Sequence, residues 1–166
     1  GGACSAMAEP AGTPPAVDVV VVNFNAGEAL LRCIRSVLAQ DLAVRLTLVD
    51  NASTDGSAER AAAEFGGRPG FSLLRSPDNP GFATAVNRAV ALSLHPSPAG
   101  DASLPVADFL LILNPDCELA PGALAALCRA LAADPAAGLA GPLVTDAAGR
   151  AQRGTLRRFP DPWKSF

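Results

Sequence analysis

Short apolar runs of strand length place the strongest constraint on how this chain can fold. Val19–Val22 is an unbroken run of valines inside an expected strand at Val17–Asn23, and Phe109–Leu113 forms most of a second expected strand at Asp108–Leu113. Runs without polar alternation are typical of strands that are covered on both faces. A sheet of such strands needs helices on both of its sides.

The segments between these runs carry the spacing of helices. From Glu28 to Leu38, apolar residues fall three and four positions apart, which places them on one side of a helix. The other expected elements are strands at Arg45–Asp50, Phe71–Arg75 and Gly138–Val144, helices that end near Phe65, cover Phe82–Leu94 and run from Pro121 to about Asp134, and a turn at Asp146–Gly149. This alternation predicts an α/β fold with a mostly parallel, Rossmann-like sheet and right-handed crossovers.

The expected organisation is one domain over residues 17–150. Residues 1–16 are interpreted as a tag remnant and a flexible lead-in, and His95–Leu104, rich in proline and serine, as a surface insertion. Residues 151–166 form a basic and aromatic tail, which we expect to lead to an absent acceptor half. The alternative for this tail is contact with an anionic membrane surface.

Composition excludes several classes of protein. The net charge of −3 gives no drive toward nucleic acid, and no segment has the roughly 20 uncharged apolar residues that span a bilayer. The four cysteines include no CxxC pair, so reduced thiols are expected, which suits the cytoplasm. Peripheral association with the inner face of the membrane is the alternative location.

Polar residues follow three of the expected strands at the point where each strand ends. These are Asn23–Phe24–Asn25, Asp50–Asn51 and Asn114–Pro115–Asp116. In open parallel sheets, ligands bind beyond the carboxyl ends of the strands. The pattern therefore predicts one site that is assembled from distant parts of the sequence.

Two common phosphate-binding loops are absent from the sequence. The first turn, Asn23–Glu28, has one glycine rather than the GxGxxG of a dinucleotide-binding fold, and there is no GxxxxGK[ST]. A diphosphate bound here would need another source of positive charge. A divalent cation held by Asp116 is the natural candidate.

Four blocks of sequence, in order, resemble the family 2 inverting glycosyltransferases of GT-A fold. They are Val19–Asn25, Leu48–Ser57, Asn79–Asn87 and Leu113–Asp116. The Asn-Pro-Asp form of the last block is most similar to the rhamnosyltransferase branch, whose donor is dTDP-L-rhamnose. Related galactofuranosyl- and other hexosyltransferases keep the donor sugar open, and both dTDP- and UDP-linked donors remain candidates.

The resemblance assigns donor-binding roles to individual positions. Phe24 matches an aromatic residue that stacks on the nucleobase, with a core phenylalanine as the alternative. Asp50 matches an acid that accepts a hydrogen bond from a pyrimidine, with a turn-forming aspartate as the alternative. The remaining donor-binding positions that it implies are Asn25, Asn51, Asn79, Gly81, Asn87 and Asn114.

The resemblance also implies a cation, Mg²⁺ or Mn²⁺, on Asp116. Asn114 replaces the first acid of the family's DxD motif, so one charge is lost. The alternative for this block is a turn that follows a buried strand. Inverting transfer also needs a general base, and the separated acids Asp134, Asp146 and Asp161 do not fit it. We expect the base beyond Phe166 and therefore a chain that is poorly active or inactive alone.

The sequence thus predicts the donor-binding part of a glycosyltransferase that acts on a cell-surface glycan or lipid-linked acceptor. A non-catalytic nucleotide-binding or interaction module is the main alternative. A nucleotidyltransferase is disfavoured, because Asn25–Glu28 is neither glycine-rich nor basic.

Overall fold

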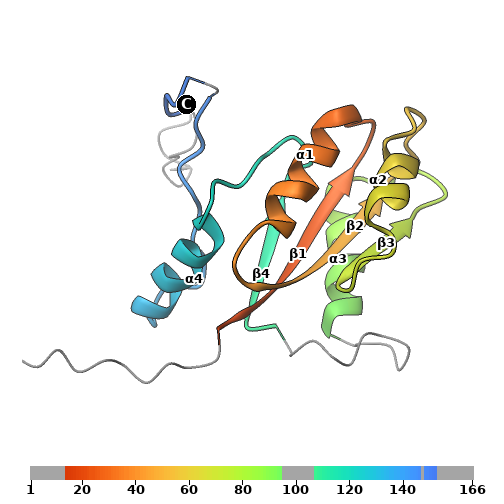
Figure 1. Cartoon of the computed structure of the whole chain (residues 1–166). Coiled ribbons are helices and arrows are strands. Elements are labelled where there is room, and N and C mark those ends of the chain that lie inside the picture. Colours follow the sequence, from red (N-terminus) through yellow and green to blue (C-terminus); the bar gives the residue numbers. More distant parts are fainter. Residues whose placement is uncertain (1–13, 95–106, 147, 153–166) are drawn as a thin grey trace, which may run out of the picture.

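The computed structural model describes residues 14–94, 107–146 and 148–152. Strands and helices alternate along these residues (Figure 1). The elements are β1 (Ala16–Asn23), α1 (Gly27–Leu38), β2 (Ala43–Asp50), α2 (Ser57–Phe65), β3 (Phe71–Arg75), α3 (Phe82–Leu94), β4 (Phe109–Leu113) and α4 (Ala123–Ala133). The expected insertion and most of the tail lie outside the described residues.

The four strands form one parallel sheet in the order β3-β2-β1-β4. The chain adds β2 and then β3 on one side of β1, and β4 returns to the other side. Strand order therefore reverses between β1 and β4, and such a reversal opens a crevice at the carboxyl ends of the two strands. The parallel sheet predicted from the sequence is confirmed.

Side chains of β1 alternate between two apolar layers. Val17, Val19 and Val21 pack with residues of α1, α2 and α4, whereas Val20 and Val22 pack against α3. Helices cover both faces (Figure 1). This arrangement explains why β1 is buried along its whole length.

On the α3 side, the sheet is only partly covered. Leu110 and Ile112 of β4 face this side, because they pair in register with Asp18 and Val20, and they are 44% and 47% exposed. Their neighbours Phe109 and Leu111 pack on the opposite, covered face. The mixed burial of β4 was not expected, since its sequence is as apolar as that of a strand covered on both sides.

Of two elements expected at the C-terminal end, the strand is wrong and the turn is confirmed. Residues 138–144 form no strand, and nearby only Thr145 and Ala151 make an isolated antiparallel bridge. Gly138 and Gly141 weaken a strand, Pro142 cannot donate to a ladder, and Leu139 is 92% exposed. The turn at Asp146 is confirmed by a hydrogen bond from the Gly149 amide to the Asp146 carbonyl oxygen.

Several boundaries differ from the expected ones by one or two residues. β1 begins at Ala16, inside the expected lead-in, and β2 begins at Ala43. Helix α4 begins at Ala123 rather than at Pro121. Gly122 adopts a left-handed backbone (φ 73°), so Pro121 precedes the helix instead of opening it.

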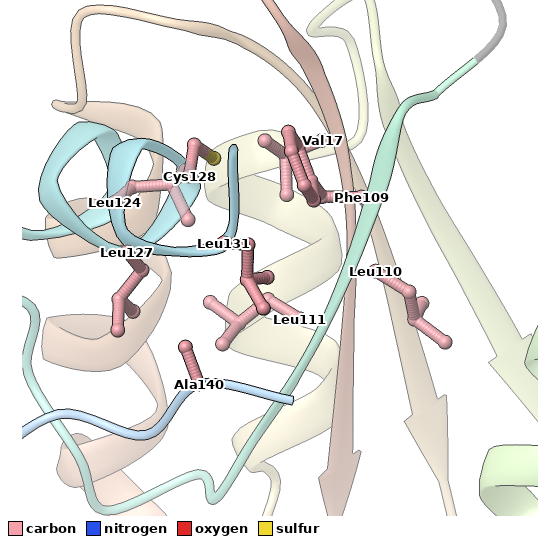
Figure 2. A pocket seen from close by; sticks show the side chains of 9 residues that line it. All are labelled: Val17, Phe109, Leu110, Leu111, Leu124, Leu127, Cys128, Leu131 and Ala140. Atoms are coloured by element: carbon pink, nitrogen blue, oxygen red, sulfur yellow. The ribbon is translucent and has the colours of Figure 1, made fainter. Parts of the chain in front are cut away.

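An apolar hollow lies between α4 and the first residues of β1 and β4 (Figure 2). Leu124, Cys128 and Leu131 of α4 line it together with Val17 and Phe109. Since β1 and β4 begin here, the hollow lies at the sheet edge opposite their polar carboxyl ends. Among the described helices, none is long and apolar enough to cross a membrane.

Candidate donor site at the carboxyl edge of the sheet

Asn23, the last residue of β1, lies at the centre of a buried hydrogen-bond network. Its side-chain Nδ2 donates to Asp50 Oδ1 (2.8 Å), Ser53 Oγ (2.9 Å) and Ser57 Oγ (2.8 Å). Its Oδ1 accepts a hydrogen bond of 3.3 Å from the Ala26 amide. Asn23 is fully buried. One side chain thus joins the ends of β1 and β2 to the starts of α1 and α2.

Asp50 ends β2 and is 2% exposed. Its Oδ2 accepts a hydrogen bond of 3.2 Å from the Ser53 amide, and its Oδ1 accepts from Asn23. The turn-forming role is therefore present in the structure. A carboxylate has lone pairs for further donors, but a nucleobase can reach this one only if the side chains that cover it move.

The loop between β2 and α2 is tied to the end of β1 by reciprocal bonds. The Asn25 amide donates to Ser53 Oγ (3.0 Å), and Asn25 Oδ1 accepts from the Thr54 amide (2.8 Å). Asn25 (φ 55°) and Ala52 (φ 59°) both have left-handed backbones. For alanine this conformation costs on the order of 1 kcal/mol, and such strain is concentrated at functional sites.

Asp55 links the first turns of α1 and α2. Its Oδ1 accepts from the Ser57 hydroxyl (2.6 Å) and amide (3.0 Å), and its Oδ2 accepts from the Gly27 amide (2.8 Å). The Ser57 hydroxyl, followed by the amides of Ser57 and Gly27 and by Arg60, lowers the pKa of the Asp55 carboxyl, although partial desolvation opposes the effect. Asp55 therefore builds the turn that leads into α2 and ties it to the start of α1.

Asn51 points to the other face of the sheet, toward the loop that precedes α3. Its Nδ2 donates to Asn79 Oδ1 (3.2 Å) and to the Gly81 carbonyl oxygen (3.4 Å). Asn79 Oδ1 also accepts from the Gly81 amide (3.0 Å). Asn51 is 2% exposed, and its own Oδ1 has no hydrogen-bond partner among the described residues. A buried oxygen without a donor is costly, so this loop is a place where a ligand or water would complete the structure.

Gly81 adopts a left-handed backbone with φ 87°. No atom outside its chain neighbours lies within 4 Å of the position that a Cβ would take. Backbone conformation rather than lack of space therefore explains the glycine.

Phe24, the first residue after β1, is 52% exposed, so the interpretation as a core phenylalanine is wrong. Phe82, the first residue of α3, is 49% exposed and was not singled out from the sequence. Both rings lie at the end of the molecule where the strands finish. Asn87 is exposed on α3 and makes no side-chain hydrogen bond within the described residues.

Asn114–Asp116 follows β4 on the other side of the crevice. The Cys117 amide donates to the Asn114 carbonyl oxygen (3.2 Å), which closes a turn around Pro115. The side chains of Asn114 and Asp116 are exposed. The same carbonyl oxygen lies 3.5 Å from Cys33 Sγ of α1. Helix α1 therefore contacts the backbone of this turn, while the side chains of Asn114 and Asp116 stay exposed to solvent.

The buried thiol beneath the turn is chemically quiet. Burial, followed by Cys117 and the carboxylates of Asp116 and Glu118, raises the pKa of Cys33 to about 12. Burial and Asp116 also raise the pKa of the Cys117 thiol. A protonated thiol is a poor nucleophile, so the Cys33 side chain is unreactive at neutral pH.

The residues here fit a cation only if the ion brings other ligands. No group of three or more His, Cys, Asp or Glu side chains that could hold a metal occurs among the described residues. Asp116 is exposed, and within the described part of the chain its side chain accepts only a weak contact from the Cys117 thiol (3.9 Å). Mg²⁺ commonly binds one or two carboxylates together with phosphate oxygens and water. One carboxylate beside an amide suits that mode.

The described acids downstream of Asp116 make contacts away from the motif loops. Glu118 pairs with Arg32 (2.8 Å), Asp134 accepts from the Ala136 amide (3.0 Å), and Asp146 pairs with Arg150 (3.0 Å). Asp161, the last of the separated acids, lies outside the described residues. None of the three described acids is positioned at the carboxyl edge by a contact with the motif loops.

The strand order of the sheet reverses beside β1, and polar motifs follow three of its strands. Open α/β sheets bind their ligands at this place. The sequence pattern of the family described as "Glycosyl transferase family 2" matches residues 18–165. The chain belongs to glycosyl transferase family 2. The family prediction made from the four motif blocks is thereby confirmed.

Among characterised relatives of this family 2 chain is the N-acetylglucosaminyl-diphospho-decaprenol L-rhamnosyltransferase of Mycobacterium tuberculosis. It is 39% identical over 130 residues, which cover 77% of this chain and 41% of the relative. The succinoglycan biosynthesis protein ExoU of Rhizobium meliloti is 34% identical over 86 residues, 52% of this chain and 25% of that protein. The chain thus spans about two fifths or less of the length of these relatives.

Two solved structures share the fold. The mannosyltransferase PcManGT from Pyrobaculum calidifontis, in complex with GDP-Man and Mn²⁺, has a TM-score of 0.58 and 27% identity, over 74% of this chain and 33% of that one. Residues 1–349 of Staphylococcus aureus TarS give a TM-score of 0.55 at 16% identity, over 70% of this chain and 32% of that one. These neighbours confirm the GT-A fold, of which this chain represents a part.

Sequence reasoning missed Asn23 as a site residue. It was placed among the polar residues at the strand ends but was given no role of its own, yet it makes the largest set of side-chain bonds in the network. A signal existed, because a polar residue that ends an otherwise buried strand needs buried partners, and the serines of the next motif are such partners.

Proposed function

We propose that this family 2 chain supplies the donor and metal site of a glycosyltransferase that transfers a sugar from a nucleoside diphosphate, with inversion. The observation that carries the proposal is the convergence of three motif segments at one sheet edge. The Asn23–Asp50 network joins two of them, and the turn at Asn114–Asp116 lies across the strand-order reversal from β1. Ligands of open α/β sheets bind at such a reversal.

The nucleobase has two candidate contacts at the ends of β1 and β2. The half-exposed ring of Phe24 offers a stacking surface. Asp50 accepts a hydrogen bond from the pyrimidine once the side chains that cover it have moved. The buried Oδ1 of Asn51 has no donor among the described residues, so a ligand or water beside the loop of Asn79 and Gly81 would complete its hydrogen bonding.

The diphosphate would be neutralised by a cation on Asp116, with Asn114 as an oxygen ligand to the ion, to its water or to the ribose. The cation would supply Lewis-acid stabilisation of the departing diphosphate. Support for a cation comes from the mannosyltransferase neighbour, whose structure contains both a sugar nucleotide and Mn²⁺. In this chain, Asp116 and Asn114 hold and orient the leaving group rather than attack the sugar.

Rhamnose from dTDP-L-rhamnose is the proposed sugar, and a lipid-linked or cell-surface glycan is the proposed acceptor. The support is the mycobacterial relative, whose name describes an L-rhamnosyltransferase that acts on a diphospho-decaprenol. We place the general base beyond Phe166, so this chain alone would transfer poorly or not at all. Cytoplasmic location, with peripheral contact with the membrane, remains a prediction.

A non-catalytic nucleotide-binding module is the second candidate. The contacts of the described downstream acids favour this candidate. None of these acids is held by a contact with the motif loops, where a general base would be needed. The two candidates share the donor site and differ in turnover.

Calorimetric titration of dTDP and UDP, with and without Mn²⁺, tests the donor site directly. The wild-type chain should bind one of them, more tightly with Mn²⁺, and Asp116→Ala should remove the effect of the metal. Asn114→Asp adds a negative charge beside Asp116 and should increase the effect of Mn²⁺ on nucleotide binding. A folded chain that binds neither nucleotide in any condition would overturn the proposed donor site.

Hydrolysis of dTDP-L-rhamnose, or transfer from it, separates the two candidate functions. Slow but measurable release of dTDP that needs Mn²⁺ supports the transferase. Tight binding without any turnover, even in a chain extended to the length of the relatives, would favour the non-catalytic module.

A further inference from the structure

Asn23 is the best-connected polar side chain at the carboxyl edge. Its Nδ2 has two hydrogens and three acceptors within 2.9 Å, on Asp50, Ser53 and Ser57. Two hydrogens among three close acceptors require sharing, so the amide is held from several sides. A side chain that is fully buried and bonded in this way has a single orientation.

The direction of each bond shows why an amide is needed here. The Ser57 hydroxyl donates its proton to Asp55 Oδ1 (2.6 Å), so its oxygen can only accept from Asn23. Both Asp50 oxygens accept as well, Oδ1 from Asn23 Nδ2 and Oδ2 from the Ser53 amide. Position 23 must therefore donate toward β2 and α2 while it accepts from the Ala26 amide. Asparagine does both, and aspartate of the same shape cannot donate.

Asp50 has no cationic partner among the described residues. The salt bridges of the described residues involve other carboxylates, and Asp50 accepts from Asn23 Nδ2 and the Ser53 amide. A buried carboxylate without a counter-ion depends on its hydrogen bonds for stability and orientation. Of these two donors, only Asn23 comes from another strand.

We propose that Asn23 is a positioning residue for nucleotide recognition, which fixes the direction of the Asp50 carboxylate and the placement of the Ser53 loop. This inference rests on the proposed function, because it assigns to Asn23 a role in base recognition through Asp50. Asn23 itself is fully buried and need not touch the nucleotide. Its effect reaches the ligand through Asp50 and through the loop bonds between Ser53 and Asn25.

The variant Asn23→Asp gives a test that a merely structural role would not pass. It replaces the donor with a carboxylate that lies 2.8 Å from Asp50 Oδ1. Two ionised carboxylates at this distance repel each other, so the pair takes up a shared proton as the pH is lowered and loses it as the pH is raised. The titratable groups around position 23 are Asp50 and, through Ser57, Asp55. The shared proton restores a donor toward Asp50.

The experiment is titration of dTDP, in the presence of Mn²⁺, into the wild-type chain and Asn23→Asp at pH 5 and pH 8. We expect the variant to bind roughly tenfold or more weakly at pH 8, which is the loss expected for a hydrogen bond to a charged group. At pH 5 the difference should shrink to roughly twofold. A ratio of dissociation constants that is the same at both pH values would overturn the inference.

Asp18→Asn is the matched control. It exchanges an acid and an amide at a buried position of the same strand, where Asp18 bonds across to Arg45 of β2 at the end remote from the site. It should leave the dissociation constant and its pH dependence as in the wild type. If it reproduces the behaviour of Asn23→Asp, general loosening of β1 and β2 accounts for both, and the inference is overturned.

A measurement on the wild-type chain tests the inference even if the Asn23→Asp variant does not fold. In ¹⁵N-labelled protein, the side-chain amide resonances of Asn23 should shift when dTDP is added, because Asp50 then gains a donor beyond Asn23 Nδ2 and the Ser53 amide. Resonances that stay unmoved at saturating dTDP would overturn the inference. Absence of dTDP and UDP binding by the folded wild type would instead overturn the proposed function on which it rests.

Discussion

Asp18 and Arg45 form an ion pair with two hydrogen bonds, of 2.6 and 2.8 Å, across the first halves of β1 and β2. The two residues are partners in the register of the parallel strands, and Asp18 is 5% exposed. This pair lies at the opposite end of the sheet from Asn23 and Asp50, which are also register partners. Polar cross-strand contacts therefore fix both ends of the β1–β2 ladder, one for stability and one at the candidate site.

Arg45→Ala should lower the free energy of unfolding by about 3 kcal/mol, because it leaves the Asp18 carboxylate buried without a partner. Replacing both residues with apolar ones, Asp18→Leu with Arg45→Met, should recover most of the loss. Urea unfolding of the variants measures both effects. A cost below about 0.5 kcal/mol for Arg45→Ala, the level of an ordinary surface substitution, would contradict this role.

Phe24→Ala should weaken nucleotide binding without destabilising the fold. The ring is half exposed, so its removal should change the free energy of unfolding by less than about 0.5 kcal/mol. Loss of stacking on a base costs about 1–3 kcal/mol of binding free energy. Calorimetry with dTDP checks the prediction, with the equally exposed Phe82→Ala as the comparison. Equal losses from both variants would show that the base is not read specifically by Phe24.

Stability at acid pH should depend on Asp55. Because its pKa is lowered in the folded chain, first by the Ser57 hydroxyl, its contribution is fully present above the ordinary value of 3.8 and is lost as pH falls through the lower, folded pKa. Asp55→Asn should therefore flatten the fall of stability below about pH 4. Urea unfolding between pH 6 and pH 3 gives the two slopes, and parallel curves would contradict the assignment.

Stability at alkaline pH should depend on Cys33. Its folded pKa of about 12 exceeds the ordinary 9.0, so its contribution is complete below pH 9 and is lost as pH rises toward 12. The difference corresponds to on the order of 4 kcal/mol. The chain has no tyrosine and a single lysine, so cysteines dominate titration in this range. Cys33→Ala should make stability between pH 8 and pH 10.5 less steep, and an unchanged slope would contradict the prediction.

The order of the elements and the family followed from local sequence. The valine run of β1, the spacing of α1 and the four motif blocks each depend on neighbouring residues, and the structure and the family match confirm them. The expected strand at residues 138–144 failed because an apolar segment becomes a strand only beside a partner. Leu139 and Leu143 find no such partner and are exposed.

The candidate site was predictable as a set of strand ends and not as a set of contacts. Register pairing brings Asn23 beside Asp50, residues that are 27 positions apart in sequence. Pleating then sends Asp50 toward the loop before α2 and Asn51 toward the loop before α3, although the two residues are adjacent. The exposure of Phe24 and the burial of Asp50 also depend on how separate segments pack, which motif residues alone do not specify.

The sequence by itself determined the alternating strands and helices, the parallel sheet and the membership of glycosyl transferase family 2, because these depend on local periodicity and on motif order. Only the tertiary structure decided that Asn23 holds Asp50, that the oxygen of Asn51 is left without a donor and that one face of β4 is half exposed. Hydrogen bonds and burial between distant residues arise from strand register and helix packing. These in turn are set by the whole apolar core rather than by any one segment.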